Sequence, residues 1–495
     1  MKKYVLVIDE GTTGTRALIF DKKFNIIGSA YEEITQYTPK QDRVEHDAME
    51  IYEKSVKVCK EALLGASVDP NDIDSIAITN QRNTTVLWDK TTGEPITKAI
   101  VWQDTRTADL CTDIKNGPKG EKILQTTGKV MAPFCVGVLL KWMLENVEGA
   151  KQKAEAGQLL AGTIDSWLVW KLTGRQVHAI SYSNASSSGI MNLEAQSWYG
   201  ELLDDLGIPA SLLPEIREES ADYGKTDFLG PNIPITGVAA DQQSALFAQG
   251  CYEKGTVKCT NGTGTFMDIN IGTKCVVVGG GLDTLIAWKL NGETVYCVEG
   301  FESVTGSIIQ WLRDGLEIIA TSKDSEDIAN SVEDTNGVFF VPALAGLISP
   351  QQDPYARGLI IGLTRGVKRA HIVRAALEAI ALRTKDIIDA VEKSTGIKIS
   401  EMKIDGGASQ NNLLAQMMAD YMSAKIVRPL ITEASSIGAA QFAGIYTGFY
   451  KKEDFEVITA ASERVFEPRM PEEERNKKYS TWKEAVNRSM GWAKF

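Results

Sequence analysis

Two runs of glycine and threonine, about half a chain apart, are the residues best suited to binding phosphate. The first is Asp9-Glu-Gly-Thr-Thr-Gly-Thr-Arg16, and the second is Asn261-Gly-Thr-Gly-Thr265. Apolar residues flank both runs, which predicts a β-hairpin with a polar tip in each case. Such tips present backbone N–H groups and hydroxyls to phosphate oxygens. Glycine-threonine turns also occur in ordinary hairpins, so it is their recurrence beside a carboxylate that favours phosphate binding.

Two aspartates could carry out phosphoryl-transfer chemistry. Asp9 ends the first predicted strand and could face Mg²⁺, which prefers one or two carboxylates together with waters and substrate phosphates. The alternative for Asp9 is an Asx-type turn cap that needs no metal. Asp241 follows a Gly237-Val-Ala-Ala turn and begins a predicted helix. It could be the helix N-cap, or a general base that accepts a proton from a substrate hydroxyl during attack on the γ-phosphate.

A third phrase, Asp405-Gly-Gly407, lies between a predicted strand and a predicted helix. Without side chains, such a junction lets the backbone approach an adenosine or its phosphates closely, although a tight turn alone would use the same residues. The Walker A phrase Gly-x-x-x-x-Gly-Lys-Ser/Thr is absent, which disfavours a P-loop fold.

The elements that must position these residues alternate between strand and helix, which predicts an α/β protein. Strands are expected at 73–79, near 99–102 and at 399–405, with helices at 244–248 and 411–424. A chain of 495 residues exceeds one ordinary core. We expect two lobes of related construction, 1–246 and 247–495, each with one Gly-Thr hairpin and joined by a packed hinge.

Composition excludes several functional classes. The net charge of −12 argues against nucleic-acid binding. No run approaches 18 apolar residues, so we expect no membrane segment and a cytoplasmic protein. The seven cysteines have no Cys-x-x-Cys pair and there are only three histidines, so neither a zinc site nor a disulfide framework is indicated.

These phrases together resemble the FGGY carbohydrate kinases of the actin/hexokinase-like superfamily, and within them the glycerol-kinase branch, over essentially the whole chain. The matching phrases are Asp9-Glu-Gly-Thr-Thr, Val44-Glu-His-Asp47, Ile78-Thr-Asn-Gln-Arg82, Ala99-Ile-Val-Trp-Gln103, Asp241-Gln-Gln, Gly262-Thr-Gly264, Ile309-Gln-Trp-Leu-Arg-Asp314, Asp353-Pro-Tyr-Ala-Arg-Gly358, Gly362-Leu-Thr-Arg-Gly366 and Asp405-Gly-Gly407.

The resemblance implies two ribonuclease-H-like lobes around a cleft for ATP and Mg²⁺, a polyol or sugar substrate, and a homodimer or homotetramer. Asp241 takes the position of the catalytic base and Asp9 that of the metal-proximal carboxylate. The implied nucleotide positions are Thr12, Thr13, Gly14, Arg16, Thr263, Gly264, Gly306, Gln310, Gly407 and Asn411. The implied substrate positions are Arg82, Asn83, Trp102, Phe134, Asp241, Gln242 and Phe266.

Two of these substrate positions depart from the glycerol-kinase pattern. Asn83 stands where that branch has glutamate, and Phe134 stands where it has tyrosine. Asp104 adds a carboxylate to the segment that carries Trp102. Losing an acceptor and a donor would leave glycerol hydroxyls unpaired, at about 1–3 kcal/mol each. We therefore expect a pocket retuned for a larger polyol, a ketose or a cyclitol such as an inositol or inosose.

Two alternatives stay open. Water could fill the gaps left at Asn83 and Phe134, which would leave an ordinary kinase that makes glycerol 3-phosphate. A non-catalytic actin-like nucleotide-binding protein would share both phosphate hairpins, but it would not need Trp102 or the turn at Arg82.

Overall fold

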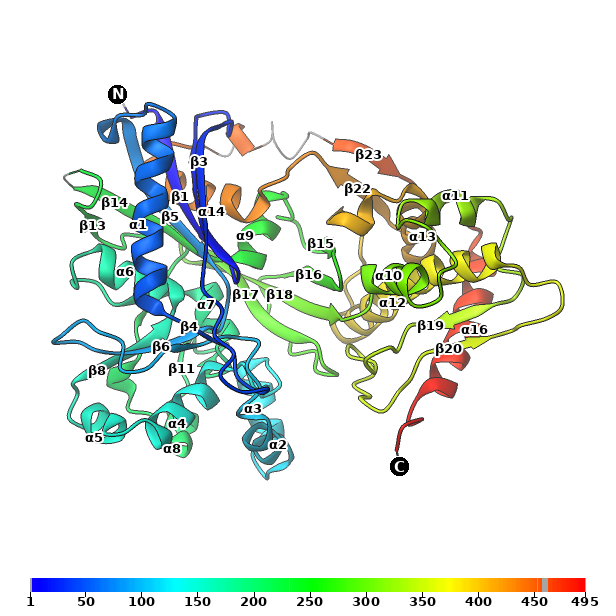
Figure 1. The fold of residues 1–495 in the computed structure, drawn as a ribbon, viewed down its shortest axis with the longest axis horizontal. Coiled ribbons are helices and arrows are strands. Elements are labelled where there is room, and N and C mark those ends of the chain that lie inside the picture. The colour runs from blue at the N-terminus through cyan, green and yellow to red at the C-terminus, as the bar shows by residue number, and fades with distance from the viewer. Residues whose placement is uncertain (1, 231, 452, 456–461, 495) are drawn as a thin grey trace.

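Two α/β lobes lie side by side in the computed structural model, which describes residues 2–230, 232–451, 453–455 and 462–494 (Figure 1). The first lobe is built on a six-stranded sheet in the order β13-β14-β5-β1-β2-β3. The strands are β13 (Lys225–Thr226), β14 (Ile233–Ala240), β5 (Ile73–Asn80), β1 (Tyr4–Glu10), β2 (Gly14–Phe20) and β3 (Ile26–Glu33).

The second lobe is built on a seven-stranded sheet in the order β17-β18-β16-β15-β21-β22-β23. Its strands are β17 (Asp283–Leu290), β18 (Glu293–Glu302), β16 (Thr265–Gly272), β15 (Thr256–Asn261), β21 (Glu401–Asp405), β22 (Lys425–Pro429) and β23 (Ser462–Phe466). Helices α10 (Gly306–Asp314), α11 (Asp324–Asn330), α12 (Arg369–Thr395), α13 (Asn412–Met422) and α16 (Glu472–Ser489) belong to this lobe, with a short ribbon of β19 (Phe339–Val341) and β20 (Leu359–Ile361).

The two sheets repeat one topology, as the twin hairpins predict. In the first lobe β1 pairs antiparallel with β2 and parallel with β5, and β5 pairs parallel with β14. In the second lobe β15 pairs antiparallel with β16 and parallel with β21, and β21 pairs parallel with β22. Both Gly-Thr runs therefore connect an antiparallel pair at the same place in each sheet. Gly11 N–H donates to the Gly14 carbonyl over 3.0 Å, and Gly262 N–H donates to the Gly264 carbonyl over 2.9 Å.

A smaller sheet with helices extends the first lobe. It contains β4 (Glu45–His46), β7 (Ala99–Ile100), β6 (Thr85–Asp89) and β8 (Leu159–Thr163). The chain around it forms α2 (Ala108–Asn116), α3 (Gly120–Thr127), α4 (Val136–Asn146) and α5 (Ala150–Glu155). Helix α1 (Ala48–Gly65) packs on β2 and β3, and α6 (Ile164–Leu172) packs beside it. The remaining elements are α7 (Tyr182–Ser187), α8 (Gly200–Leu206), the β9 (Ala179–Ser181) and β12 (Glu215–Arg217) pair, and the β10 (Met191–Asn192) and β11 (Ser197–Trp198) pair.

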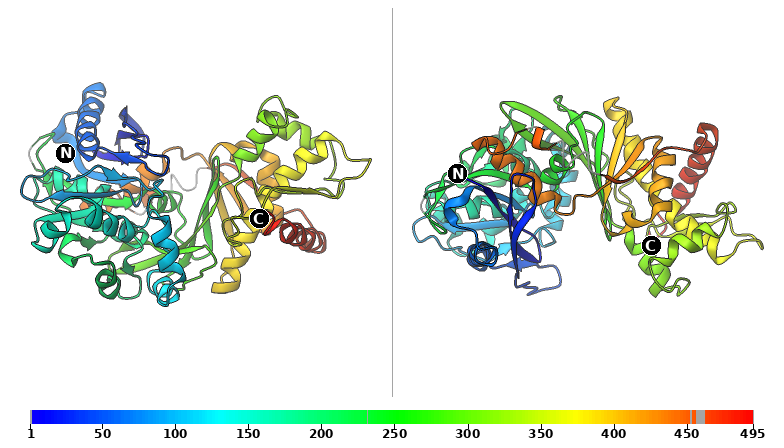
Figure 2. Two further views of the ribbon diagram at one scale, coloured as in Figure 1. Left: turned by 60° about the horizontal axis from the view of Figure 1, so that its bottom comes forward. Right: turned by 90° about the horizontal axis from the view of Figure 1, so that it is seen from above.

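Helix α14 (Ala434–Thr447) crosses back from the second half of the chain and packs on strands β14, β5 and β1. The views in Figure 2 agree that this segment lies against the first lobe. Phe442 of α14 stacks near Phe247 of α9 (Asp241–Ala248), with ring centroids 4.3 Å apart. The same apolar cluster continues to Trp288 of β17, whose ring centroid lies 5.1 Å from that of Phe247. The lobes therefore share buried apolar surface at their junction, as well as the connection near residue 247.

The Gly237-Val-Ala-Ala stretch, which we expected to be a turn, is the end of strand β14. The glycine has another purpose. A Cβ atom at Gly237 would lie 2.6 Å from the backbone nitrogen of Ala443 in α14. Glycine is required there because a helix approaches the strand closely, and the chain turns only at Asp241, where α9 begins.

Candidate active site

Three adjoining cavities form a continuous cleft that runs from the second lobe to the contact between the lobes. The α10–α13 cavity has a volume of about 770 Å³ and is lined by residues of the second lobe. The hairpin cavity, about 640 Å³, contains Asp9 and Arg16 and shares Gly407 and Gln410 with the first. The Trp102 cavity, about 470 Å³, shares Gln242 with the hairpin cavity. One extended ligand could therefore contact all three.

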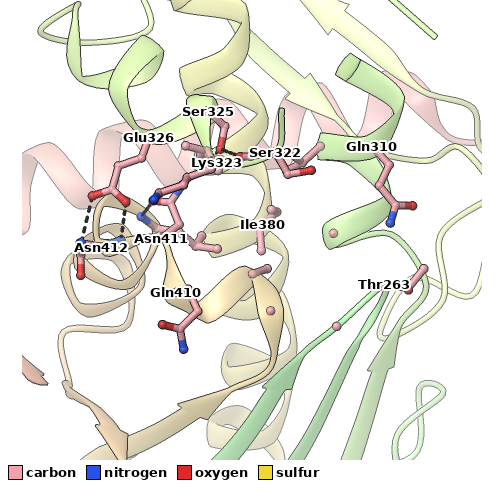
Figure 3. A pocket seen from close by; sticks show the side chains of 17 residues that line it. Thr263, Gln310, Ser322, Lys323, Ser325, Glu326, Ile380, Gln410, Asn411 and Asn412 are labelled. Carbon is pink, nitrogen blue, oxygen red and sulfur yellow. Dashed lines mark hydrogen bonds between the residues drawn. The ribbon is translucent and has the colours of Figure 1, made fainter. Parts of the chain in front are cut away.

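The α10–α13 cavity gathers residues that the sequence analysis assigned to the nucleotide. Thr263, Gly306, Gln310, Gly407 and Asn411 all line it. Figure 3 shows the side chains of Thr263, Gln310 and Asn411 around it. The second hairpin touches the start of α10, where Gly306 N–H donates to the Gly262 carbonyl over 3.0 Å. A Cβ atom at Gly306 would lie 2.5 Å from that carbonyl oxygen, so only glycine permits this contact.

Helix α11 forms one wall of this cavity, a role that no local sequence pattern predicts. Asn411 donates to Ser325 over 3.3 Å, and the backbone N–H and amide of Asn412 reach Glu326 over 3.1 and 3.2 Å (Figure 3). Asn411 also caps α13 by accepting from the N–H of Leu414 over 2.9 Å. Hydrogen bonds between α11 and the start of α13, which lie far apart in the sequence, therefore hold this wall in place.

The hairpin cavity brings acidic and basic groups of both lobes together. Asp9 accepts a hydrogen bond from Ser436 over 2.7 Å, and Arg16 pairs with Glu433 over 2.8 Å. Burial raises the pKa of Asp9 to about 6, against the opposite effects of the Ser436 hydrogen bond and the Arg16 charge. Burial thus disfavours the Asp9 carboxylate anion, and a nearby cation would relieve that cost.

Lys258 lies in the same cavity and was missed by the sequence analysis. It is buried, pairs with Asp268 over 3.3 Å and donates a short hydrogen bond to Gln242. Burial opposes its charge, but the carboxylates of Asp268 and Asp405 outweigh that effect and hold its pKa above the ordinary lysine value. A signal existed, because Lys258 and Asp268 are the charged residues facing each other across the predicted second hairpin.

The Trp102 cavity places Asp241 beside a partly buried arginine. Arg82 Nε lies 3.5 Å from Asp241 Oδ1, and Arg82 Nη1 lies 2.6 Å from Glu299 Oε2 on strand β18 of the other lobe. Asp241 is the first residue of α9 and accepts the N–H of Gln242 over 2.7 Å, while Ala240 occupies the N-cap position. Its side chain is 31% exposed, so the carboxylate that Arg82 orients faces the cavity.

Aromatic rings form the apolar walls of this cavity. Trp102, Phe134, Phe266 and Phe301 all line it. The Phe266 and Phe301 rings lie 4.5 Å apart between centroids, and the indole N–H of Trp102 donates to the Thr12 hydroxyl over 2.9 Å. Because Thr12 also lines the cavity, this bond joins the first hairpin to the wall.

Asn83 combines an unusual backbone with an unsatisfied side chain. Its φ angle is 66°, in the left-handed region that asparagine tolerates better than most residues. The residue is 6% exposed and its Oδ1 atom has no hydrogen-bond partner among the described residues. A buried acceptor without a partner is costly. The Oδ1 atom has almost no accessible surface, so a ligand hydroxyl would reach it only after the Asn83 side chain turns toward the cavity.

The structure does not bring Asp104 into the cavity. Its carboxylate is 1% exposed and accepts from the Val44 N–H over 2.8 Å and from Arg106 Nε over 2.8 Å. It holds the segment after Trp102 in place and does not line the Trp102 cavity.

Thr13, Gly14 and Gly264 lie in the hairpin tips but line none of these three cavities. Gly14 packs against Tyr31, and a Cβ atom there would lie 2.4 Å from the Tyr31 hydroxyl oxygen and 2.5 Å from two ring carbons.

Three further charged residues line the Trp102 cavity without having been predicted. Lys129 forms a short ion pair with Asp283, and Glu299 holds Arg82. Attraction to Arg82 and Lys129 outweighs burial and lowers the pKa of Glu299 below its ordinary value. No local pattern marks these residues, because their partners are far away in the sequence.

Two α/β lobes of one topology, each with a Gly-Thr hairpin beside the cavities at the contact between the lobes, form the two-lobed actin/hexokinase-like fold. The sequence profile of the FGGY family of carbohydrate kinases matches this chain, with the N-terminal domain at residues 4–248 and the C-terminal domain at residues 257–446. The chain therefore belongs to the FGGY family of carbohydrate kinases and is an ATP-dependent kinase of a carbohydrate or polyol.

Similar proteins extend over the full chain. Glycerol kinase 2 of Thermotoga maritima is 47% identical over 494 residues, covering 99% of this chain and 100% of that protein. The glycerol kinase of Brachyspira hyodysenteriae is 48% identical over 493 residues, covering 100% of both chains. The crystal structure of Plasmodium falciparum glycerol kinase with ADP superposes with a TM-score of 0.94 at 33% identity, covering 98% of each chain. Among the described residues, no helix is both long enough and apolar enough to cross a membrane.

Proposed function

We propose that this protein transfers the γ-phosphoryl group of ATP to a hydroxyl of a neutral polyol, and that glycerol is one such substrate. The relatives named glycerol kinase, at 47% and 48% identity over the full chain, support glycerol. The observation that carries the proposal is the Asp241 carboxylate, which Arg82 orients at the junction of the Trp102 cavity and the phosphate hairpins.

In this proposal the adenosine occupies the α10–α13 cavity and the phosphates extend into the hairpin cavity. Thr263 and Gly306 would then lie beside the nucleotide, and Arg16 and Lys258 would neutralise phosphate charge. Phosphoryl transfer depends mainly on positioning and charge neutralisation, so these groups and one base are sufficient. Asp241 would accept the proton of the attacking hydroxyl while Arg82 fixes the carboxylate.

Asp9 fits the metal-proximal role. Its half-buried carboxylate accepts the Ser436 hydrogen bond through one oxygen and lines the same cavity as the proposed phosphate contacts. Among the described residues, no three His, Cys, Asp or Glu side chains are grouped so that they could hold a metal ion. Mg²⁺ does not need such a group, because it commonly takes one or two carboxylates together with waters and phosphate oxygens. When bound there, Mg²⁺ would neutralise charge on the transferred phosphoryl group.

A larger acceptor is the second candidate, and Asn83 favours it. The unpartnered Oδ1 of Asn83 and the apolar ring of Phe134 replace an anionic acceptor and a phenolic donor in one cavity. A larger polyol, a ketose or a cyclitol would meet a different set of hydrogen-bonding groups there than glycerol does.

The test is coupled ADP release with glycerol, erythritol, xylitol, xylulose, myo-inositol and inosose. Glycerol-dependent ADP release is expected. ADP release with another of these acceptors but none with glycerol would favour the second candidate, a larger acceptor, over glycerol. No acceptor-dependent release with any member would refute a polyol substrate.

A further inference from the structure

The segment that follows α3 brings a lysine into the wall of the Trp102 cavity. The Thr284 N–H on β17 donates to the Gly128 carbonyl over 2.8 Å, which fixes Lys129 next to Asp283. The Lys129 side chain is only 2% exposed, and it forms a short ion pair with Asp283. Both residues line the cavity, so this is a buried charged pair presented to whatever the cavity holds.

The pair has hydrogen-bonding capacity left over. An ammonium carries three N–H donors. Among the described residues, Lys129 donates a hydrogen bond to Asp283, and its Nζ lies 5.2 Å from the centroid of the Phe134 ring. A phenylalanine ring attracts the cation but offers no lone pair, so Lys129 can still donate to a ligand oxygen.

The cavity continues beyond Lys129. A neighbouring chamber of about 190 Å³ is lined by Lys129, Val130 and Gln352, all of which also line the Trp102 cavity, and by residues of α2 and α3. Asp241 does not line this chamber. Lys129 therefore borders both the Trp102 cavity and this chamber, and a longer acceptor could extend from the one toward the other.

The charges of the Trp102 cavity select against an anionic acceptor. Its two cations are already paired, Lys129 with Asp283 and Arg82 with Glu299 and Asp241. A carboxylate or phosphate on the acceptor would therefore face three carboxylates without an uncommitted cation, whereas hydroxyls and carbonyls can bond to both members of each pair.

We propose that Lys129 and Asp283 form a distal subsite that determines acceptor specificity, in which Lys129 donates to a hydroxyl or carbonyl oxygen and Asp283 accepts from a hydroxyl of a neutral polyol or ketose longer than glycerol. The proposal rests on the polyol kinase activity proposed above. Asn83 lines the same cavity. In this proposal an acceptor longer than glycerol contacts the proximal groups and this subsite together.

The experiment compares kcat/KM for glycerol, erythritol, xylitol, xylulose and gluconate in wild type, Lys129→Met and Lys129→Met/Asp283→Asn. The double variant removes the carboxylate that the single variant leaves buried without a partner. Lys171→Met is the matched control, because Lys171 also lies over aromatic rings, 4.9 Å from Tyr52 and 5.2 Å from Trp167, but outside the cavity.

We expect the wild type to prefer one of the longer neutral acceptors over glycerol. Both Lys129 variants should lose at least ~10-fold in kcat/KM on that acceptor and change less than ~3-fold on glycerol, because a pocket group that bonds an acceptor oxygen discriminates by about that factor or more. Retained glycerol turnover shows that the variants are folded.

Three results would refute the subsite but leave the proposed kinase function standing. They are an unchanged acceptor selectivity in both variants, an equal loss of kcat/KM on all acceptors, and a wild-type preference for gluconate. Absence of turnover of every acceptor by the wild type would instead refute the proposed function, and the subsite with it.

Discussion

The indole N–H of Trp102 donates a hydrogen bond to the hydroxyl of Thr12 over 2.9 Å. Trp102 lies in the wall of the Trp102 cavity and Thr12 lies in the tip of the first Gly-Thr hairpin. In the proposed function this bond would couple the position of the acceptor to that of the phosphate loop. Gln81 reinforces the same coupling by donating from its amide to the Gly11 carbonyl over 3.0 Å.

Replacing Trp102 by Phe should weaken this coupling without removing the apolar wall. We expect a decrease of about 5-fold in kcat/KM for the acceptor, because one neutral hydrogen bond contributes about 1 kcal/mol. Trp198→Phe is the control, since its indole donates to the Pro214 carbonyl over 2.9 Å and does not line the cavity. An equal loss in both variants would contradict a specific role for the Trp102 bond.

Asp241→Asn should abolish most turnover while leaving the nucleotide site intact. The neutral amide cannot accept the hydroxyl proton, so kcat should fall by ~10²–10⁴-fold, the usual contribution of general base catalysis. Steady-state kinetics and calorimetric titration with ADP would measure the two effects. Near wild-type turnover in this variant would refute Asp241 as the base.

Asn83→Glu combined with Phe134→Tyr should shift selectivity toward glycerol. The double variant restores an anionic acceptor and a phenolic donor in the Trp102 cavity, and a change of about 1.4 kcal/mol corresponds to a tenfold change in kcat/KM. Glutamate at a φ of 66° costs some stability, and neighbouring residues couple, so the single variants must be measured as well. A fall in the ratio of glycerol to xylulose activity in the double variant would count against the retuned pocket.

Glu10→Gln should stabilise the protein increasingly as the pH rises. Burial raises the pKa of Glu10 to about 8 from an ordinary value of 4.5, so between these values the folded state holds a proton that the unfolded state releases. Folding of the wild type is then penalised by about 1.4 kcal/mol per pH unit across this window, and the penalty is constant above it. The amide mimics the protonated acid at every pH and avoids the penalty.

Urea unfolding at pH 5, 7 and 8.5 would test the sign. The free energy of unfolding of Glu10→Gln should exceed that of wild type most at the highest pH and converge with it at the lowest. Glu61→Gln, at a residue whose side chain is 46% exposed, is the control and should show no such growth with pH. A difference that shrinks as the pH rises would contradict the buried-acid interpretation.

Binding of both substrates should close the lobes. The twin hairpins lie on separate sheets and must converge on one ATP, and closure would exclude water from the transferred phosphoryl group. Small-angle scattering should show a smaller radius of gyration with glycerol and a non-hydrolysable ATP analogue together than with either alone. An unchanged radius at saturating concentrations of both ligands would argue against a mobile hinge.

The amino-acid sequence alone determined the α/β fold, the two hairpins and the strand–Gly-Gly–helix junction. These features are encoded in short stretches, because alternating apolar residues around a Gly-Thr tip specify a hairpin wherever it occurs. Family resemblance also predicted Asp241, Arg82, Trp102 and Phe266, and the structure gathers all four around one cavity.

Only the tertiary structure decided which charges face the acceptor. Lys129 and Asp283 are 154 residues apart, and their pairing depends on how β17 packs against the segment after α3. Asp104 follows Trp102 by two residues in the sequence, yet its carboxylate points away from the cavity and accepts hydrogen bonds from Arg106 and the Val44 N–H. Gly237 reads locally as a turn but serves the close approach of α14. Side-chain direction and long-range contact follow from the packing of whole elements, and local residue patterns do not encode that packing.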